Sequence, residues 1–501
     1  MEQAQGSGGW LGTFAYRLDL AGLLLSIARL PVMNKWFFFL FLGCAVLAQR
    51  GAAQPAAASA PPALREFQGR YEYFNHTTLE LAASPRDGLL YALIAGSRYP
   101  LYPIGPALFR NASQDTVRFQ RDAAGKITGY SVSGQRFRLL TRNVQFPAAM
   151  WYPRPVDAAH PFAYRYTAPP RTTDGLPVGT LAGTGLDPQL LATMVTKIVD
   201  GTLPNVHSVL IIKEGKLVFE EYFYEYGRES LHPLRSATKS IVSALTGVAV
   251  AQGLVPGVQA PVVGFFPEYT LQHPSPLKQA ITVQDLLTNQ SGLDYDISDP
   301  KAAGNEVAMG NSRDWVKYTL DLPMREAPGT VGRYNSGNPI TLGRLVEKQA
   351  RQPLPEFARQ HLFGPLGITR FDWRFQPDSS SAETFCQVSL RPRDMAKFGL
   401  LYLDQGRWQG RQVVPATWVT ASLTKHSVVQ NVDYGYLWWL KYLDAGSTRY
   451  YGAAAQGNGG QRIWVLPQQH LVVVVTGGNY NQQSPSDELI ATYVLAAFNQ
   501  E

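Results

Sequence analysis

The sequence predicts an α+β protein: a small all-β domain followed by a larger domain with an antiparallel sheet, flanking helices and a helical lobe. Short runs of alternating polar and apolar residues fill 67–145. Prolines and glycines crowd 146–187, which predicts a linker. Strand-like segments begin and end 188–501, with helical segments between them, so the two ends should share one sheet. The 501 residues are 45% hydrophobic and 17% charged, which is typical of a globular protein.

Charge and cysteine content exclude several classes of function. The formal net charge is +7, but Lys and Arg are dispersed rather than gathered in a basic block, so no nucleic-acid partner is expected. Two cysteines, Cys44 and Cys386, cannot build a disulfide framework. The sequence has no His-Glu-x-x-His and no Cys or His cluster at metal-ligand spacing, so neither a metal nor another cofactor is expected.

Residues 1–53 are predicted to be a leader that contains a secretory signal peptide. Met33 begins a short charged start, and the apolar core at 36–48 that follows is too short to cross a membrane comfortably. Small residues favour cleavage after Ala53, with Ala48 as the alternative, and Met33 is the expected true start. A secreted or periplasmic protein with no stable membrane span after leader removal is therefore expected.

Two alternatives for the leader are a retained anchor that tethers the protein to the membrane and, less favoured, a lipid anchor at Cys44. The Ala/Pro-rich segment 54–66 is predicted to be a mobile linker.

The all-β domain at 67–145 is expected to be a small barrel or curved sheet. Its strand-like pieces lie at 69–74, 77–83, 89–94, 116–121 and 128–132. The pattern resembles the lipocalin-like β domains appended to secreted serine hydrolases. A packing or gating role is expected, and a ligand-carrying barrel is the alternative.

The larger domain opens with a predicted helix at 188–199 and a hairpin of strands at 208–212 and 217–222. Helices are expected at 283–287, 312–320, 341–350, 355–362, 392–403, 415–423 and 487–498, and strands at 462–466 and 470–476. A cleft between sheet and helical lobe would be the natural site.

The segment around Ser236-Ala237-Thr238-Lys239 carries the main catalytic hypothesis. A proline precedes it, and an apolar run to Gly253 follows, so Ser236 should lie at or just before a helix N-terminus. Residues i and i+3 share a helix face, so the Lys239 amine can reach the Ser236 hydroxyl. Burial favours a neutral amine, which can act as a base toward the serine. By itself the tetrapeptide is common, and an exposed helix cap is its alternative reading.

Three further stretches follow in order: 285–296 (DLLTNQSGLDYD), 332–338 (GRYNSGN) and 455–461 (AQGNGGQ). As an ordered set with Ser236-Ala237-Thr238-Lys239 they resemble the serine β-lactamase and penicillin-binding-protein superfamily, in its class C and esterase branch. The set is most similar to the 6-aminohexanoate-dimer hydrolase group, and the runs 390–402 and 434–439 support the likeness. The resemblance covers about 190–498 and implies that 188–501 is a serine hydrolase domain.

The resemblance also implies roles for individual residues. Ser236 would attack the carbonyl, Lys239 would accept its proton, and Tyr334, hydrogen-bonded to both, would carry that proton to the leaving group. The backbone N–H groups of Ser236 and Gln461 would bind the oxyanion. The residues implied to contact substrate are Ser336, Asn458, Gly459, Gly460, Asp294 and Asp296.

The chain departs from the superfamily pattern at the strand start, where Asn458-Gly459-Gly460 stands in place of Lys-Thr-Gly. Without that cation, a partner for the carboxylate of β-lactams is missing. The expected function is therefore hydrolysis of a small amide or ester through an acyl-enzyme. The alternatives are a penicillin-binding or β-lactam/peptidoglycan-sensing protein and a class C-like β-lactamase. Absence of Gly-x-Ser-x-Gly argues against an α/β-hydrolase, and the sequence leaves the oligomeric state open.

Overall fold

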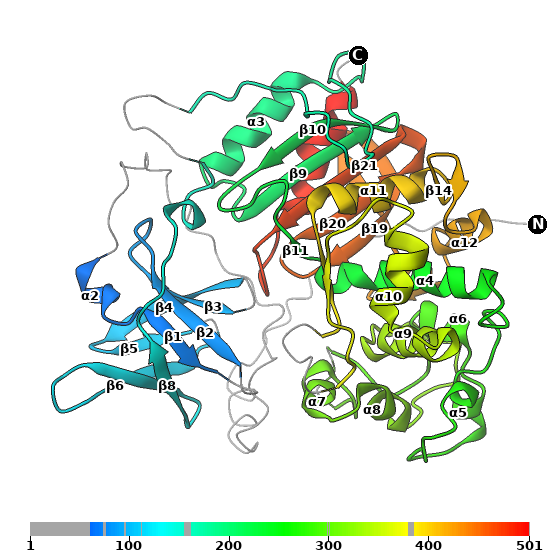
Figure 1. Ribbon diagram of the computed structural model, residues 1–501, viewed down its shortest axis with the longest axis horizontal. Helices are drawn as coiled ribbons and strands as arrows, with labels where there is room; N and C mark the ends of the chain where they lie inside the picture. The colour runs from blue at the N-terminus through cyan, green and yellow to red at the C-terminus, as the bar shows by residue number, and fades with distance from the viewer. Residues whose placement is uncertain are drawn as a thin grey trace, which may run out of the picture.

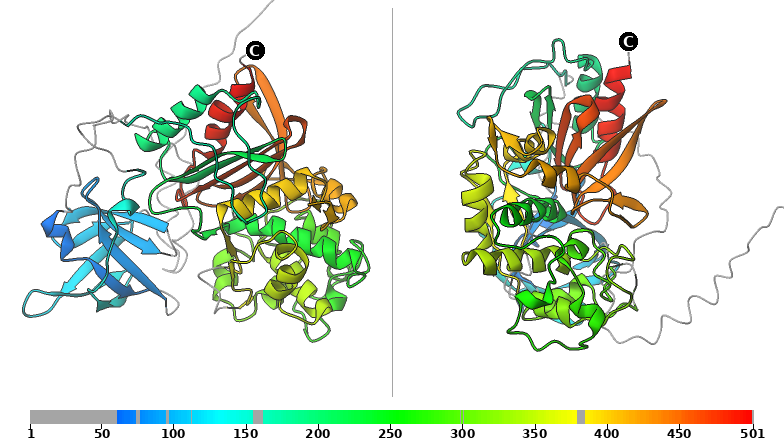
Figure 2. Two further views of the ribbon diagram at one scale, coloured as in Figure 1. Left: turned by 45° about the horizontal axis from the view of Figure 1, so that its top comes forward. Right: turned by 90° about the vertical axis from the view of Figure 1, so that its right-hand side faces the viewer.

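The computed structural model describes residues 61–499 except 74–76, 95–96, 112, 155–161, 298, 300 and 379–384 (Figure 1). The predicted leader at 1–53 and most of the Ala/Pro segment lie outside the described residues. Within the described part of the chain, no helix is both long and apolar enough to cross a membrane. The N-terminal barrel lies beside the larger domain in two of the views (Figures 1 and 2).

Eight antiparallel strands form the closed N-terminal barrel, in which β8 pairs back to β1. The strands are β1 (Gly69–Glu72), β2 (Thr78–Ala83), β3 (Leu90–Ile94), β4 (Ser97–Gly105), β5 (Leu108–Arg110), β6 (Thr116–Arg121), β7 (Ile127–Val132) and β8 (Gln135–Thr141). In the segments predicted to alternate, the apolar side chains point into the barrel, as Val117 and Phe119 of β6 do. The prediction of a small all-β domain is confirmed.

Aromatic side chains fill the barrel interior. Phe67, Phe109 and Phe119 pack with ring centroids 4.6–5.5 Å apart, and Tyr71 and Tyr130 extend the cluster at 5.6 Å from each other. A small barrel whose inward positions carry rings is a packed core. This favours the predicted packing or gating role over the ligand-carrying alternative.

Two segments predicted as linkers carry structure. A short helix, α2 (Pro62–Arg65), ends the Ala/Pro segment, because Pro is well suited to the first helical turn. The Pro/Gly-rich segment between the domains is bound to the larger domain by Arg393, whose guanidinium donates to the carbonyl of Pro170 at 2.8 Å and to Thr172 at 2.6 Å. Arg393 is 2% exposed and also pairs with Glu220, so this attachment is buried.

The larger domain is organised around an eight-stranded antiparallel sheet in the order β10-β9-β21-β20-β19-β18-β17-β16. Its strands are β9 (Val206–Lys213), β10 (Lys216–Tyr222), β16 (Ser427–Val429), β17 (Val432–Tyr434), β18 (Trp439–Ala445), β19 (Thr448–Gly457), β20 (Gln461–Leu466) and β21 (Leu471–Gly477). The pairing of β9 with β21 joins the two ends of the domain in one sheet, as predicted.

Both faces of this sheet are buried, which explains the continuous apolar runs of β9 and β21. On β9, Leu210 and Ile212 pack on one face and Val209 and Ile211 on the other. Helices α4 (Thr238–Ala251) and α11 (Pro392–Leu403) cover the first face. Helix α3 (Pro188–Val199) and the C-terminal segment α13 (Ser486–Leu489), η10 (Ile490–Leu495) and η11 (Ala496–Asn499) cover the second.

The helical lobe packs against α4 on the side away from the sheet (Figure 2). Its helical elements are α5 (Pro276–Gln279), α6 (Val283–Leu287), α7 (Glu306–Asn311), α8 (Trp315–Asp321), α9 (Gly337–Ala350), α10 (Leu354–Ala358) and η7 (Arg359–Phe363), with α12 (Ala416–Ser422) and the 3₁₀ turn η6 (Val263–Phe265) nearby. Short strands β11 (His232–Pro233), β13 (Val388–Leu390) and β12 (Asp372–Trp373) link lobe and sheet. The α+β architecture predicted from the sequence is confirmed.

Helix α4 runs through the middle of the domain, and 12 of its residues, Thr238 to Ala249, are buried. A Cβ at Gly247 would lie 2.4 Å from the indole of Trp418 on α12, so a residue without a side chain is required there. The close packing fixes α4, and with it the position of its N-terminus.

Candidate active site

Ser236 and Lys239 meet at the N-terminus of α4. Ser236 lies in a 3₁₀ turn, η5 (Arg235–Ala237), directly before the helix, and the Lys239 Nζ lies 2.9 Å from the Ser236 Oγ. Lys239 is 9% exposed, whereas Ser236 is partly exposed. The amine is therefore shielded from water while the hydroxyl remains accessible, the arrangement that a serine nucleophile and its base require.

The turn that carries Ser236 is held in an unusual conformation. Arg235 has φ +52°, in the left-handed region that side-chain-bearing residues rarely adopt. On one side the backbone N–H of Leu234 donates to the carbonyl of Val388 at 2.9 Å. On the other, β19 approaches so closely that a Cβ at Gly457 would lie 2.1 Å from the Leu234 carbonyl oxygen. The glycine thus permits the central sheet to contact the nucleophile turn.

Tyr334 lies beside this pair and meets it through its ring face. The Lys239 Nζ lies 5.0 Å from the ring centroid, and the ring stacks on Trp439 at 5.7 Å with an interplanar angle of 23°. The recorded contact is with the ring, so the hydrogen bonds of the phenol to Ser236 and Lys239 stay a prediction.

The loop before α9 is fastened to the turn after α6 by a buried asparagine. The Asn289 Oδ1 accepts from the backbone N–H of Asn335 at 3.4 Å and from the Asn338 Nδ2 at 3.0 Å. The Asn289 carbonyl accepts from the N–H of Arg333 at 2.8 Å. These bonds set the position of Tyr334 between Arg333 and Asn335.

Asp294 and Asp296 form ion pairs with arginines. The Asp294 carboxylate lies 3.4 Å from Arg325, and Asp296 lies 3.2 Å from Arg333, which also pairs with Glu326 at 2.7 Å. These ion pairs give both aspartates a structural role, in which they stabilise the loops around Tyr334. A contact of either carboxylate with substrate stays a prediction.

Ser336 is buried and donates a short hydrogen bond to the carboxylate of Glu306 on α7. Tyr295 faces the same group, and burial, with the Glu306 charge, raises the pKa of the Tyr295 phenol well above its ordinary value. Sequence reasoning missed Glu306, which stands in no motif, and the short helix α7 that begins with it was not predicted either.

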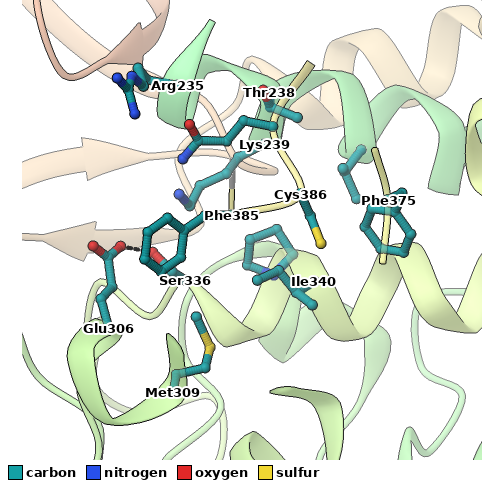
Figure 3. Close-up of a pocket in the computed structure, with 13 residues that line it drawn as sticks. Arg235, Thr238, Lys239, Glu306, Met309, Ser336, Ile340, Phe375, Phe385 and Cys386 are labelled. Atoms are coloured by element: carbon teal, nitrogen blue, oxygen red, sulfur yellow. Dashed lines mark hydrogen bonds between the residues drawn. The ribbon is translucent and has the colours of Figure 1, made fainter. Parts of the chain in front are cut away.

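A pocket opens beside Lys239 and Ser336 (Figure 3). Lys239, Ser336 and Glu306 line one side of it, and Phe375 and Cys386 lie on the other. The remaining side chains of the lining are mostly apolar: Val242, Met309, Pro339, Ile340 and Phe385, with Arg235, Thr238 and Gln387. The pocket therefore presents a mostly apolar surface beside the Lys239 side chain.

The two glycines of the Gly-rich stretch that were implied to contact substrate lie in a tight hairpin. Gly459 and Gly460 have φ +92° and +98°, and a Cβ there would lie 2.6 Å from the Tyr480 ring and 2.3 Å from the Ser484 Oγ, respectively. Both glycines are therefore required by the hairpin itself. A direct contact with substrate stays a prediction for each.

The two neighbours of these glycines are engaged elsewhere. The side chain of exposed Asn458 exchanges hydrogen bonds with Asn481, at 2.7 and 2.9 Å. Gln461 is buried, is in register with Gly457, and bonds through its side chain to both the N–H and the carbonyl of Gly477. The oxyanion role of the Gln461 N–H stays a prediction, and Gly457 of the same hairpin packs closely against Leu234 and Arg235 of the nucleophile turn.

Comparison with known proteins decides the family. The sequence pattern of the beta-lactamase family matches residues 195–497, more than half of the chain. The chain belongs to the beta-lactamase family. This confirms the superfamily resemblance and identifies the protein as a β-lactamase-related serine hydrolase.

Among curated proteins, the 6-aminohexanoate-dimer hydrolase of Paenarthrobacter ureafaciens is 23% identical over 53% of this chain and 70% of its own length. The lovastatin esterase of Penicillium rubens is 29% identical, over 34% of this chain and 46% of its own length. The chain thus matches less than half of the second relative. Among solved structures, simvastatin synthase (LovD) of Aspergillus terreus superposes with a TM-score of 0.50 at 15% identity, over 63% of this chain and 99% of that chain. This likeness supports the fold alone.

Proposed function

We propose that the protein cleaves a small amide or ester through an acyl-enzyme formed on Ser236. The observation that carries the proposal is the 2.9 Å hydrogen bond between Ser236 and the buried amine of Lys239 at the start of α4. Relatives named as an amide-dimer hydrolase and an esterase support the same reaction class.

In the proposed reaction, neutral Lys239 takes the proton of the Ser236 hydroxyl as the oxygen attacks the carbonyl. Tyr334 would then pass the proton to the leaving amine or alkoxide. The Lys239 amine lies 5.0 Å from the centroid of the Tyr334 ring, and this proximity to the pair supports the role of Tyr334. Water replaces the leaving group and hydrolyses the ester formed with Ser236.

Backbone N–H groups would stabilise the oxyanion. Ser236 supplies the first because it precedes α4, whose dipole favours negative charge. The second would come from the hairpin that joins β19 and β20, where Gln461 is the predicted donor. The contact of Gly457 with the nucleophile turn supports a donor from this hairpin.

The acyl group would be small and apolar, because Val242, Met309 and Ile340 line the pocket next to Lys239. A series of p-nitrophenyl esters of increasing chain length measures this preference. We expect kcat/KM to rise with chain length until the pocket is filled and then fall.

Arg235 gives the alternative function a specific basis. The chain lacks the Lys-Thr-Gly cation, yet Arg235 directly precedes the nucleophile in the sequence and is one of the residues that line the pocket. A cation there is suited to the carboxylate of a β-lactam or a peptidoglycan stem. A β-lactamase or sensor therefore remains the second candidate.

One labelling experiment separates these functions. The purified protein is treated with a fluorophosphonate and compared with the Ser236→Ala variant, then assayed with p-nitrophenyl esters, a linear amide dimer and a chromogenic cephalosporin. Labelling that depends on Ser236, with turnover of an ester or amide, supports the proposal. Wild-type protein that is not labelled would show that Ser236 is not the nucleophile, and stable acylation by the cephalosporin without turnover would favour the sensor.

We also propose that the mature protein acts outside the cytoplasm, on the basis of the predicted signal peptide. Fractionation of cells that express the full chain, with N-terminal sequencing of the product, tests this. A product that begins at residue 54 or 49 in the envelope or medium is expected.

A further inference from the structure

Two residues at the start of β4 in the barrel enter the hydrolase domain next to the nucleophile. Ser97 is fully buried although it begins a barrel strand, and the Arg98 side chain is 13% exposed. Ser97 contacts Arg235, the residue directly before Ser236, whereas Arg98 contacts Tyr224, Glu225 and His207 of the larger domain.

Arg98 reaches into a group of aromatic side chains on the hydrolase. Its guanidinium lies over the ring of Tyr224 at 4.9 Å, lies 3.7 Å from the Glu225 carboxylate, and has a terminal nitrogen 3.4 Å from the Nε2 of His207. His207 lies on β9 and stacks on Tyr226 at 4.0 Å. An arginine nitrogen can only donate, so the His207 Nε2 accepts this bond.

That acceptor fixes a chain of hydrogen bonds. With Nε2 as acceptor, neutral His207 carries its proton on Nδ1 and donates to the Nε2 of His232 at 2.9 Å. His232 then carries its own proton on Nδ1, which lies 3.3 Å from the carbonyl oxygen of Pro233. The direction of every bond is set by Arg98, and the chain ends three residues before Ser236.

The electrostatics agree with two neutral histidines. Burial, the neighbouring His232 and the Arg98 charge lower the pKa of His207 well below its ordinary value. Burial lowers the pKa of His232 to about 4. The groups that face His207 are Arg98, His232 and the rings of Tyr224 and Tyr226, with Glu225 paired to Arg98.

Ser97 makes the second connection. Its hydroxyl accepts from the Arg235 Nη2 at 3.1 Å, and the Arg235 guanidinium lies over the Tyr480 ring at 4.6 Å. Arg235 directly precedes Ser236 and carries the left-handed φ of the turn. A buried hydroxyl that holds this side chain limits the conformations open to the turn.

We propose that Ser97 and Arg98 of the barrel are positioning residues for Ser236, which hold the nucleophile turn through Arg235 and through the His207–His232 chain to Pro233. The barrel thereby contributes to acylation without contact with substrate. The inference rests on the proposed function, because it presumes that Ser236 is the nucleophile.

The test uses the full chain and single substitutions. Arg98→Met keeps an unbranched side chain over Tyr224 but removes the donor, Arg98→Lys restores a donor and the charge, and Ser97→Ala removes only a hydroxyl. Arg136→Met, at an exposed arginine of β8, is the matched control. The rate constant of fluorophosphonate labelling, kcat and KM for a p-nitrophenyl ester, and Tm are measured for each.

We expect Arg98→Met and Ser97→Ala to lower the labelling rate and kcat by about tenfold or more, the size of effect that misplacement of a reacting group produces. KM should stay within about threefold, Arg98→Lys should recover a large part of the loss, and Arg136→Met should match wild type. If Arg98 only filled space, the Arg98→Met and Arg98→Lys variants should have similar labelling rates. If Arg98→Met folds poorly, Ser97→Ala still tests the proposal.

Failure of the inference and failure of the proposed function differ in outcome. If Ser236→Ala abolishes labelling but Arg98→Met and Ser97→Ala label at the wild-type rate, the positioning role is wrong and the nucleophile assignment stands. If wild type is not labelled at Ser236, both are overturned. A loss of rate that follows a loss of Tm in equal measure in both variants, without rescue by Arg98→Lys, also overturns the positioning role.

Discussion

Replacement of Lys239 by Met tests the proposed base most directly. The amine lies 2.9 Å from the Ser236 Oγ, and its removal leaves the hydroxyl without a proton acceptor at that position. General-base catalysis typically contributes about 10²–10⁴-fold, which corresponds to roughly 3–5 kcal/mol of transition-state stabilisation. We expect kcat/KM for a p-nitrophenyl ester, and the rate of fluorophosphonate labelling, to fall by that factor.

Stability should respond differently. Lys239 is 9% exposed, and burial of a polar amine is costly, whereas Met of similar length fills the same volume. We therefore expect the urea midpoint to be unchanged or higher while activity collapses.

Lys239→Arg serves as the control that retains charge, because an arginine cannot be deprotonated in a protein. It should be as inactive as Lys239→Met. Full activity of Lys239→Arg would mean that the residue acts as a charge. Activity of Lys239→Met within threefold of wild type would refute the assignment of the base.

Three further predictions concern other parts of the domain. Tyr334→Phe removes the phenol oxygen but retains the ring that contacts Lys239. Because the proton transfer to the leaving group is lost, kcat should fall by about 10²-fold or more with KM nearly constant. Steady-state kinetics in which only KM rises would contradict the proton transfer. Gly247→Ala places a Cβ 2.4 Å from Trp418 and should lower the free energy of urea unfolding by about 1–3 kcal/mol, while Gly264→Ala, which has open space around it, should have little effect. The buried His207 and His232 have lowered pKa values in the folded protein. Between pH 6.5 and about 4 the unfolded chain therefore binds more protons than the folded protein does. Acid should destabilise the protein in that window by up to about 1.4 kcal/mol per pH unit for each histidine. Urea midpoints measured across this range should fall as the pH falls, and the slope should flatten in His232→Gln; an unchanged slope would contradict neutral, buried histidines.

Sequence patterns were most reliable where local chemistry alone determines an element. The predicted helices at 188–199, 283–287 and 392–403 have the bounds seen in α3, α6 and α11. α3 and α11 begin with a proline in the first turn, and α6 begins with a capping box between Thr282 and Asp285. Such signals depend on a few neighbouring residues, so they are visible without the fold.

Strand β19 shows where the sequence was insufficient. Its second half, Gly452-Ala453-Ala454-Ala455, has weak strand propensity, and the strand exists because β18 and β20 pair with it on both sides. Glu306 was missed for a related reason. Its link to Ser336 joins residues 30 positions apart, and neither stands in a pattern that predicts the contact.

The Gly-rich stretch has a structural requirement that the sequence did not reveal. The resemblance implies that Gly459 and Gly460 contact substrate, and that contact stays a prediction. In the structure the positive φ values and the nearness of Tyr480 and Ser484 already exclude a side chain at either position. The glycine of this stretch that touches the nucleophile turn is Gly457, at the end of β19.

The conformation of Arg235 brings these observations together. A left-handed φ at a residue with a side chain costs roughly 1–3 kcal/mol, and it persists only where the surroundings hold it. Here the Leu234 N–H is bonded to Val388, the β19 backbone closes over the Leu234 carbonyl, and the Arg235 side chain is held by Ser97 and Tyr480. A glycine at 235 would relieve the strain but would lose the last of these contacts. An arginine is therefore explained at this position if its side chain, and with it the barrel, is needed to keep Ser236 within reach of Lys239.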